Sequence, residues 1–332
     1  MNSFGRIFRL HLFGESHGEY TGIVLDGVPA GISLCVNDFT EDIERRKPLL
    51  PGTTNRKEED IPEIISGTYQ QKTTGAPLTI LFKNKNIRPE DYAHPYHFRP
   101  GHADFTAYKK FNGYNDRRGG GHFSGRLTLP LVAAGVVAKK IMSPIEINAT
   151  LVEAGGNNNI EDAIEQAIAQ NDSIGGIVSC EVKNIPAGLG EPFFDSLESM
   201  ISHGIFSIPA IKGIEFGSGF KLARMKGSEA NDVFINEKGT TATNHNGGIT
   251  GGISNGNTLV FDVVVKPTPS IMQSQKTYNW EHHQLEELTI SGRHDTCIAR
   301  RMPVIVESMT SCVIADALLL SNAFDTKPLT KE

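Results

Sequence analysis

Hydrophobic and polar residues recur along the chain with two different periods, which predict a mixture of strands and helices. Alternating or β-branched runs predict strands over residues 4–13, 21–26, 76–83, 145–153, 173–184, 212–223 and 258–265. Helical spacing predicts helices over residues 38–47, 129–141, 160–170, 194–203 and 302–320, and a short helix or turn over 280–290. Several strands follow one another without a helix between them, so the pattern predicts an α+β fold with largely antiparallel sheets.

Capping residues predict where several of these helices begin and end. Asp38 and Glu41 have the spacing of a capping box at the start of the first helix. Thr128 and Asn159 are the predicted N-caps of the second and third helices. Gly204 is predicted to close the helix over 194–203.

Composition is typical of one large or two ordinary soluble domains. The chain has 332 residues, of which 39% are hydrophobic and 21% charged. Because no long linker or internal repeat divides it, we predict a single domain over 1–332, with a disordered tail from about residue 321. The net charge of -6 gives no sign of a nucleic-acid partner.

Cysteine spacing and apolar runs indicate a cytoplasmic protein without a membrane partner. Cys35, Cys180, Cys297 and Cys312 form no CxxC pair, so we expect neither a zinc site nor a disulfide framework. The first thirteen residues include arginines and a histidine, unlike the apolar region of a signal peptide. The longest apolar run, 129–141, is shorter than the roughly 20 residues that span a bilayer.

The stretch 99–126 concentrates the residues most suited to chemistry. It begins RPGHAD and ends RRGGGHFSGR, so arginines and two histidines flank three consecutive glycines. Glycines let backbone N–H groups approach an anion, and arginines donate paired hydrogen bonds to phosphate or carboxylate. His102 and His122 could move protons near neutral pH. The stretch therefore predicts either an anion-binding, proton-transferring site or a flexible basic surface loop.

A second motif, GESHG at 14–18, matches the G-x-S-x-G nucleophile elbow and suggests a serine hydrolase that uses Ser16. That elbow needs a helix directly after the turn, whereas the following residues predict a strand. The other interpretation is a tight turn that presents His17. Neither a P-loop nor a metal-binding spacing such as H-E-x-x-H occurs, so we expect no metal.

Glycine-rich and polar segments recur near the C-terminus. A second glycine cradle spans 244–256, KPTPS follows at 266–270, and GRHD follows at 292–295. Together with the stretch 99–126 they could bind two anionic ligands.

In this order, these segments resemble the motifs of the chorismate synthase family. The matches are GESHG at 14–18, RPGHAD at 99–104, RRGGGHFSGR at 117–126, NHNGGITGGISNG at 244–256, KPTPSI at 266–271 and GRHDTCIARRMPV at 292–304. GLGEP at 188–192 and SIPAIKGIEFG at 207–217 also resemble that family. The likeness runs from about residue 4 to residue 320.

The resemblance implies a lyase that converts 5-enolpyruvylshikimate 3-phosphate to chorismate and phosphate by a 1,4-anti elimination. This is the last common step of the shikimate pathway to the aromatic amino acids. The family requires reduced FMN although no net redox change occurs. Its fold is a β-α-β sandwich, usually assembled as a homotetramer.

The resemblance also implies roles for particular residues. His17 would protonate the departing phosphate, His102 would act near the flavin, and Asp295 would help to remove the substrate proton together with the flavin. Arg46, Arg126 and Arg301 are the candidates for binding the substrate's anions. The flavin-binding candidates are His122, Phe123, Ser124, Pro209, Ala210, Gly251, Lys266, Pro267, Thr268, Pro269, Ser270 and Arg293.

The chain departs from the family pattern in two places. Many members have Arg-Ser-Ser after the three glycines and Glu after the next arginine, where this chain has His122-Phe123-Ser124 and Leu127. The loop 49–56 has no clear equivalent of a second arginine usually found there, for which Arg56 is the candidate. A non-catalytic flavin- or phosphate-binding protein is a further alternative. Because no reductase domain is added, we expect the flavin to arrive reduced, with reduction by NADPH on the enzyme left open.

Overall fold

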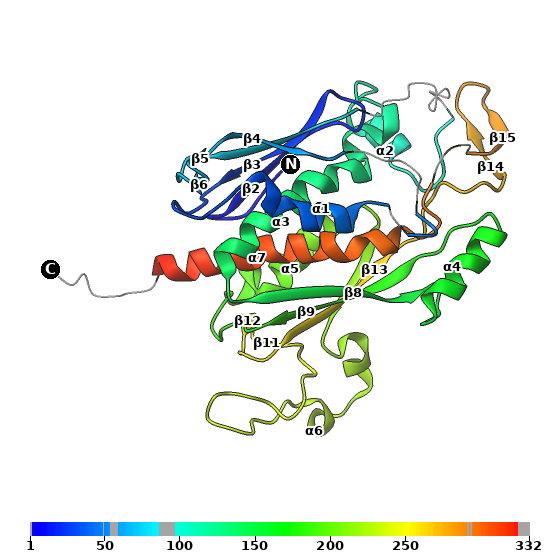
Figure 1. Ribbon diagram of the computed structural model, residues 1–332. Coiled ribbons are helices and arrows are strands. Elements are labelled where there is room, and N and C mark those ends of the chain that lie inside the picture. Colours follow the sequence, from blue (N-terminus) through cyan, green and yellow to red (C-terminus); the bar gives the residue numbers. More distant parts are fainter. Residues whose placement is uncertain are drawn as a thin grey trace.

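Two antiparallel sheets enclose a layer of helices in the computed structural model (Figure 1). The structure describes residues 2–48, 50–53, 59–85, 97–290, 292 and 294–324. The two main helices, α3 (Thr128–Met142) and α7 (Met302–Phe324), lie side by side between the sheets. The arrangement confirms the predicted α+β class and the β-α-β sandwich.

The first sheet has five strands in the order β1-β2-β3-β7-β4, and every neighbouring pair is antiparallel. Leu78, Ile80 and Phe82 of β7 are buried, whereas the residues between them are more exposed, as expected for a strand with one face in the core. The strands are β1 (Ser3–Phe4), β2 (Arg9–Gly14), β3 (Tyr20–Asp26), β7 (Leu78–Lys83) and β4 (Pro62–Ser66).

The second sheet has four strands in the order β10-β13-β9-β8, again all antiparallel. Leu259, Phe261, Val263 and Val265 of β13 are buried at alternate positions. The strands are β10 (Ile211–Phe216), β13 (Leu259–Val265), β9 (Gly176–Lys183) and β8 (Glu146–Ala154).

The helix layer is packed closely enough to need a glycine at the contact of α3 and α7. A Cβ atom at Gly135 would lie 2.4 Å from the Cβ of Ser308, so a larger residue there would force the helices apart. Helices α1 (Thr40–Arg46) and α5 (Leu197–Phe206) also pack against α7. Buried residues of both sheets and of these helices form one hydrophobic cluster.

One helical segment, Ile298–Ala323, is long and apolar enough to cross a membrane by length and composition. However, 72% of its most apolar window is buried inside the fold, as in the core helix of a globular protein. Glu307 and Asp316 interrupt the apolar sequence of this segment. Both are buried and bonded: Glu307 pairs with Arg45, and Asp316 accepts hydrogen bonds from backbone N–H groups of residues 6–8.

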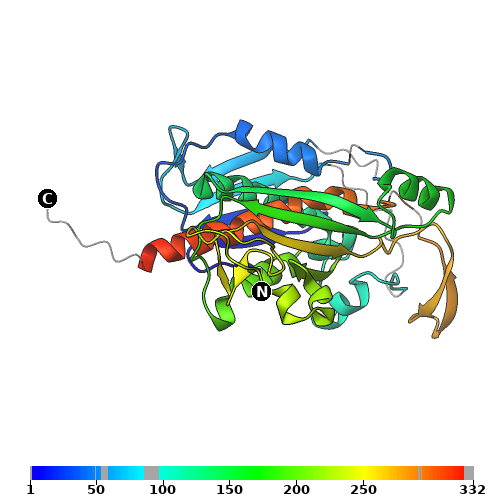
Figure 2. The same ribbon diagram turned by 90° about the horizontal axis from the view of Figure 1, so that it is seen from below.

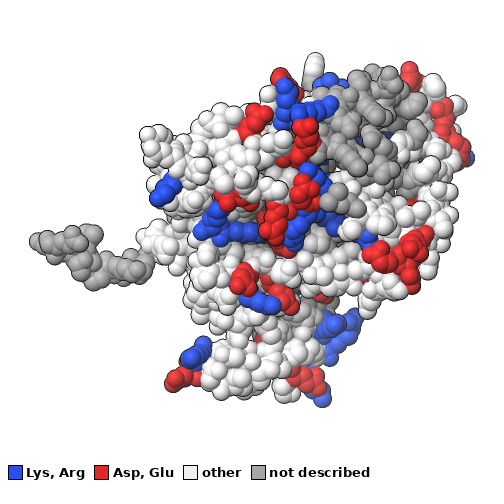
Figure 3. Space-filling model, in the orientation of Figure 1, with Lys and Arg blue, Asp and Glu red and all other residues white. Residues whose placement is uncertain are grey.

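Shorter elements complete the fold. In Figures 1 and 2 the hairpin of β14 and β15 projects from the same end of the molecule as α4. On the face shown in Figure 3, acidic and basic side chains are intermingled. These elements are β5 (Thr68–Tyr69), β6 (Lys72–Thr73), α2 (Asp104–Lys110), α4 (Ile160–Ala169), α6 (Gly227–Ala230), β11 (Ile249–Thr250), β12 (Ile253–Ser254), β14 (Gln275–Asn279), β15 (Gln284–Leu288), and the 3₁₀ helices η1 (Val36–Phe39), η3 (Arg118–Phe123), η4 (Gly125–Leu127), η5 (Phe193–Asp195), η6 (Gly219–Arg224) and η7 (Ile298–Arg301).

Three predicted elements differ in type or extent. The helix or turn expected over 280–290 holds only for the turn at 280–283, because residues 284–288 form β15, paired with β14. The strand expected over 212–223 ends at Phe216 and is followed by η6. The strand expected over 4–13 is interrupted between β1 and β2, where Gly5 has a φ of 95°.

Three predicted helix caps are also corrected. Thr128 is the first residue of α3 and its hydroxyl donates to the carbonyl of Gly125, so it is not the N-cap. Asp38 caps through the backbone N–H of Cys35 rather than in a box with Glu41. Helix α5 continues through Gly204 to Phe206.

Two further corrections concern the last helix and α4. Helix α7 continues to Phe324, so the first residues of the predicted tail are helical, while 325–332 lie outside the described residues. Asn159 does occupy the N-cap position of α4, but its side chain donates to Asp162 instead of capping the backbone.

Candidate active site

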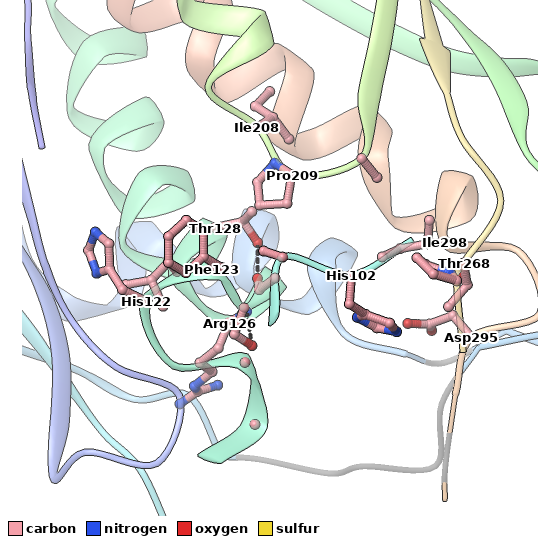
Figure 4. Close-up of a pocket in the computed structure, with 18 of the residues that line it drawn as sticks. His102, His122, Phe123, Arg126, Thr128, Ile208, Pro209, Thr268, Asp295 and Ile298 are labelled. Atoms are coloured by element: carbon pink, nitrogen blue, oxygen red, sulfur yellow. Dashed lines mark hydrogen bonds between the residues drawn. The ribbon is translucent and has the colours of Figure 1, made fainter. Parts of the chain in front are cut away.

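A cavity of about 1480 Å³ collects most of the predicted site residues (Figure 4). It lies where the β2–β3 turn, the η3–η4 segment, the KPTPS segment and the start of α7 converge. In Figure 4, His122 and Phe123 lie on one side of it, and His102 and Asp295 on the other. The predicted residues that line it are His17, Arg46, His102, His122, Phe123, Ser124, Arg126, Pro209, Ala210, Lys266, Thr268, Pro269, Ser270, Asp295 and Arg301.

Two predicted flavin residues, Gly251 and Pro267, are not among the described residues that line the cavity. Gly251 lies exposed in the tight turn between β11 and β12. Pro267 lies in the KPTPS segment. The other residues of this segment line the cavity, but Pro267 does not. Arg293 lies outside the described residues, as does Arg56 of the loop 49–56.

His17 is presented by the tight turn between two strands. The turn joins β2 to β3, so GESHG is followed by a strand and lacks the helix that a nucleophile elbow needs. Ser16 is fully buried, and its backbone N–H donates to the carbonyl of Gly121. His17 is itself 4% exposed and lines the cavity. The geometry fits the interpretation in which the turn presents His17.

The three glycines in η3 all have positive φ angles, between 54° and 80°. A Cβ atom at Gly119 would lie 2.2 Å from two ring atoms of His17, and one at Gly121 would lie 2.0 Å from the carbonyl oxygen of Asp116. Glycine is therefore required here both by backbone conformation and by the approach of this loop to the His17 ring.

The residues after the glycines have defined partners. The Nδ1 of His122 donates to the carbonyl of Gly14 over 2.8 Å, which ties the loop to the end of β2. Phe123 is 41% exposed and its ring lies near that of Phe111. The hydroxyl of Ser124 accepts from the backbone N–H of Arg126, as the N-cap of η4. The loop is therefore held in one conformation beside the cavity.

Two buried arginines share one carboxylate. Asp60 accepts a hydrogen bond from Nη1 of Arg126, and its other oxygen lies 3.7 Å from Nη1 of Arg46. Arg46 also donates to the hydroxyl of Thr128 and to the carbonyl of Gly125. Burial, followed by the charge of Arg301, lowers the pKa of Arg46, and Asp60 acts in the opposite direction. With three guanidinium groups and fewer carboxylates, this end of the cavity favours anions.

Arg301 links the arginine end of the cavity to Asp295. Its Nε donates to the backbone carbonyl of Arg46, and its Nη1 lies 3.5 Å from Oδ2 of Asp295. Asp295 is 9% exposed and lines the cavity. A carboxylate held in this way could accept a proton from a bound ligand.

His102 lies at the opposite end from the His122 loop. Its Nε2 forms a hydrogen bond of 2.7 Å with the hydroxyl of Ser270. Burial, followed by the charge of Arg99, lowers the pKa of His102 from 6.5 to about 4. The imidazole is therefore neutral at pH 7 and can either donate or accept a hydrogen bond.

The KPTPS segment packs directly on the loop that carries His102. The Nζ of Lys266 donates to the carbonyl of Gly101 over 2.6 Å, and a Cβ atom at Gly101 would lie 2.9 Å from Pro269. Burial lowers the pKa of Lys266, as does the charge of Lys212. Ala210 has an unusual φ of 76° for a residue with a side chain, and its carbonyl accepts from the N–H of Lys266.

Sequence reasoning missed two buried residues that contact the arginines, Asp60 and Asn84. Asp60 lies in a polar segment with no sequence motif that would place it near Arg126. Asn84 follows β7, and its side chain accepts from Nε of Arg126 over 2.9 Å. Neither belongs to a glycine-rich or basic motif, so only the three-dimensional contact identifies them.

The match to a known family agrees with this geometry. Residues 8–319 match the family model described as chorismate synthase. The chain belongs to the chorismate synthase family. A relative named chorismate synthase from Chitinophaga pinensis is 58% identical over 322 residues, covering 96% of this chain and 97% of that protein. Another from Dehalococcoides mccartyi is 44% identical over 351 residues, with 96% of each chain covered.

The fold is similar as well. A crystal structure of a chorismate synthase has a TM-score of 0.73 and 25% identity to this chain, covering 96% of this chain and 93% of the other. Membership of the chorismate synthase family makes the protein a lyase of aromatic amino acid biosynthesis that acts on a small molecule. It also implies a reduced flavin cofactor. Nothing in these similarities supports the serine hydrolase alternative.

Polar atoms without partners show that the cavity suits such ligands. Its volume of about 1480 Å³ exceeds the roughly 300–1,000 Å³ of an ordinary ligand pocket, which leaves room for a substrate and a flavin together. The hydroxyl of Thr268 and the Nη2 of Arg126 are buried and have no hydrogen-bond partner among the described residues. Such atoms are costly unless a ligand or water satisfies them.

Proposed function

We propose that this cavity is where the chain converts 5-enolpyruvylshikimate 3-phosphate to chorismate, and that His17 donates the proton that leaves with the phosphate. The observation that carries the proposal is that one cavity collects His17, His102, Asp295 and three arginines from distant parts of the chain. Phosphate is a better leaving group when it is protonated, and an imidazole is the side chain best suited to supply that proton near neutral pH.

Arg46, Arg126 and Arg301 would bind the anionic groups of the substrate. The substrate carries two carboxylates and a phosphate, and arginine forms paired, charge-assisted hydrogen bonds with both kinds of group. All three arginines line the cavity, and Arg46 and Arg126 are almost completely buried. Their low exposure strengthens each electrostatic contact relative to one in water.

Reduced FMN would occupy the cavity between Phe123 on one side and the KPTPS segment on the other, where Pro209 and Ala210 also line it. When bound, reduced flavin supplies electron density that favours loss of the phosphate. Lys266 offers a cation and Thr268 an unsatisfied hydroxyl on this side. His102, neutral and bonded to Ser270, would hold or share a proton beside the flavin.

Asp295 would help to remove the proton that the substrate loses. Its carboxylate lines the cavity and is held near Arg301, which is one of the arginines proposed to bind the substrate. The same contact that orients Asp295 would therefore place it next to the bound substrate.

We also propose that the protein acts as a homotetramer in the cytoplasm and receives its flavin already reduced. Large aromatic side chains on segments before α5 and around α6 favour an assembly: Phe193, Phe194, Phe220 and Phe234 are 69–93% exposed. Reduction of the flavin by NADPH on the enzyme would require an additional binding mode, which an NADPH-only assay tests.

An anaerobic assay tests the reaction. Purified protein is mixed with 5-enolpyruvylshikimate 3-phosphate and chemically reduced FMN, and chorismate is followed by its absorbance. We expect chorismate only when the reduced flavin is present. FMN binding without chorismate would instead indicate a binding protein and would direct attention to the departures at His122 and Leu127. The same assay with oxidised FMN and NADPH shows whether the enzyme reduces its own flavin.

A further inference from the structure

Two residues that belong to none of the sequence motifs hold the side chain of Arg126. Its Nη1 donates to Asp60, and its Nε donates to the side-chain oxygen of Asn84 over 2.9 Å. Its remaining nitrogen, Nη2, is buried and has no hydrogen-bond partner among the described residues. The guanidinium is therefore fixed by two contacts and keeps one nitrogen without a partner among the described residues.

Asp60 is a buried carboxylate whose surroundings are arginines. Its side chain is 3% exposed, and the side chains of Arg126 and Arg46 are each 5% exposed. Without Asp60, two guanidinium groups would face each other in a poorly solvated site, where like charges repel strongly. Its contact with Arg46 is the longer one, at 3.7 Å, so its main effect should pass through Arg126.

Asn84 connects Arg126 to the turn that carries His17. Its side-chain nitrogen donates to the carbonyls of Glu15 and Gly18, over 3.1 and 2.8 Å. Its backbone N–H donates to the carbonyl of Glu19. One buried amide thus uses its oxygen on the arginine and its nitrogen on the β2–β3 turn. An aspartate of the same shape would place an oxygen against two carbonyls.

We infer that Asp60 and Asn84 are positioning residues that together orient Arg126 for an anionic group of the substrate, and that Asn84 also fixes the distance between Arg126 and the His17 turn. This inference rests on the role proposed above for Arg126. It predicts different kinetic effects for the two residues. Asp60 should act on substrate binding, whereas Asn84 should act on both binding and the step that uses His17.

Steady-state kinetics of Asp60→Asn and Asn84→Ala test the inference in the anaerobic assay. We expect Asp60→Asn to raise KM for 5-enolpyruvylshikimate 3-phosphate about tenfold with kcat within about threefold, as for loss of a charge-assisted contact. Asn84→Ala should raise KM similarly and also lower kcat about tenfold. Inhibition by inorganic phosphate should weaken in parallel with KM.

Combination with Arg126→Ala separates positioning from general damage. If both residues act through Arg126, each substitution should change KM by less than threefold in the Arg126→Ala background. Asn279→Ala removes another buried amide, in the β14–β15 hairpin, and should leave KM and kcat unchanged. Melting temperatures of all variants show whether a loss follows from unfolding.

The outcomes distinguish the inference from the proposal on which it depends. Unchanged KM in Asp60→Asn and Asn84→Ala, with a raised KM in Arg126→Ala, overturns the inference alone. A full effect on KM that persists in the Arg126→Ala background overturns it as well. An Arg126→Ala variant with normal KM rejects the role of Arg126 and the inference together. If one substitution prevents folding, the other still decides, because each makes a separate contact with the guanidinium.

Discussion

The turn that carries His17 is held by contacts that do not use the imidazole, which makes substitution of His17 informative. The turn is held by Asn84 and by the hydrogen bond from Ser16 to Gly121, none of which uses the imidazole. His17→Ala should therefore fold and bind FMN but lose about 100- to 10,000-fold in chorismate formation, the usual contribution of a general acid. The anaerobic assay and a flavin titration measure the two properties. Normal turnover would reject the role proposed for His17.

His102 should make the folded state sensitive to mild acid. Its pKa is about 4 when folded, against 6.5 ordinarily, because of burial and the nearby charge of Arg99, with His294 and Lys266 adding and Asp104 opposing. Between pH 6.5 and 4 the unfolded chain therefore binds a proton that the folded chain does not. The stability that depends on neutral His102 is thus present above pH 6.5 and is lost as the pH falls.

Thermal unfolding from pH 7 to pH 4.5 measures this effect. We expect the melting temperature of the wild type to fall more steeply with decreasing pH than that of His102→Gln, whose side chain does not titrate. Asp104 does not titrate in this pH range. Burial raises the pKa of Asp104, but its contacts with Arg99 outweigh burial and lower the pKa below 3.8. Parallel pH profiles for the two proteins would contradict the assignment.

The residues that could be predicted from sequence are those whose chemistry is concentrated in a short motif. His17, His102 and Arg126 stand among glycines and other basic residues, and all three line the cavity. Asp60 and Asn84 could not be found in this way. Their importance arises from contacts with Arg126, from which Asp60 is separated by 66 positions and Asn84 by 42. An isolated aspartate or asparagine in a sequence does not indicate its partner.

At the scale of elements, the glycine-rich η3 segment controls the position of a histidine in another part of the chain. Gly119→Ala should add strain at a φ of 62° and push a methyl group into the His17 ring. We expect at least a tenfold loss of kcat together with a loss of stability of about 1–3 kcal/mol. Kinetics and chemical denaturation measure the two effects.

Gly156→Ala is the matched control for Gly119→Ala. Gly156 has a φ of 83°, but a Cβ atom there would meet nothing within 4 Å. This control adds comparable backbone strain without a clash and lies away from the cavity. It should lose stability and keep its activity per folded molecule. Equal losses of activity in both variants would show that strain, rather than displacement of His17, is responsible.

Buried Asp316 joins the last helix to the first sheet. Its carboxylate accepts hydrogen bonds of 2.7–2.8 Å from the backbone N–H groups of Arg6, Ile7 and Phe8, between β1 and β2. Asp316→Ala leaves these donors unsatisfied and should lower the free energy of unfolding by about 3 kcal/mol. Arg9→Ala, which breaks an exposed ion pair with Asp26, should cost less than about 1 kcal/mol. Similar losses in urea denaturation would contradict this account.

The pattern of hydrophobic and polar residues predicted strands well where one face of the strand is buried. It predicted them poorly where a strand is held mainly by pairing with its neighbour. Strands β7 and β13 bury alternate residues, so their sequence period matches their structure. The β14–β15 hairpin is mostly polar and is held by pairing between its two strands, so its sequence resembles a helix or turn. Glycine is typical of a helix end, but Gly204 lies inside α5 against Met309 of α7, a contact that the sequence does not show.

For the whole molecule, the order of predicted strands and helices along the chain was enough to predict the fold class. It was not enough to predict how the site is assembled. Consecutive strands without intervening helices indicated antiparallel sheets, and both sheets have that form. The cavity, however, is assembled from segments as distant as the β2–β3 turn and the start of α7. The single domain stays a prediction, which the shared hydrophobic cluster of both sheets supports.

Exposed aromatic side chains make the oligomeric state testable by mutation. Phe193 and Phe194 are 86% and 93% exposed, and burying each in a subunit contact would contribute about 1.5–3 kcal/mol. Sedimentation of the wild type should give about four times the chain mass of 36.2 kDa.

Phe194→Asp should shift the sedimenting protein toward smaller species, because a carboxylate in an apolar contact is strongly unfavourable. Tyr69→Asp, at a side chain 71% exposed on the β5–β6 hairpin, should leave the mass unchanged. A monomeric wild type at micromolar concentration would reject the tetramer, and a Phe194→Asp variant that keeps the full mass would place the contact elsewhere.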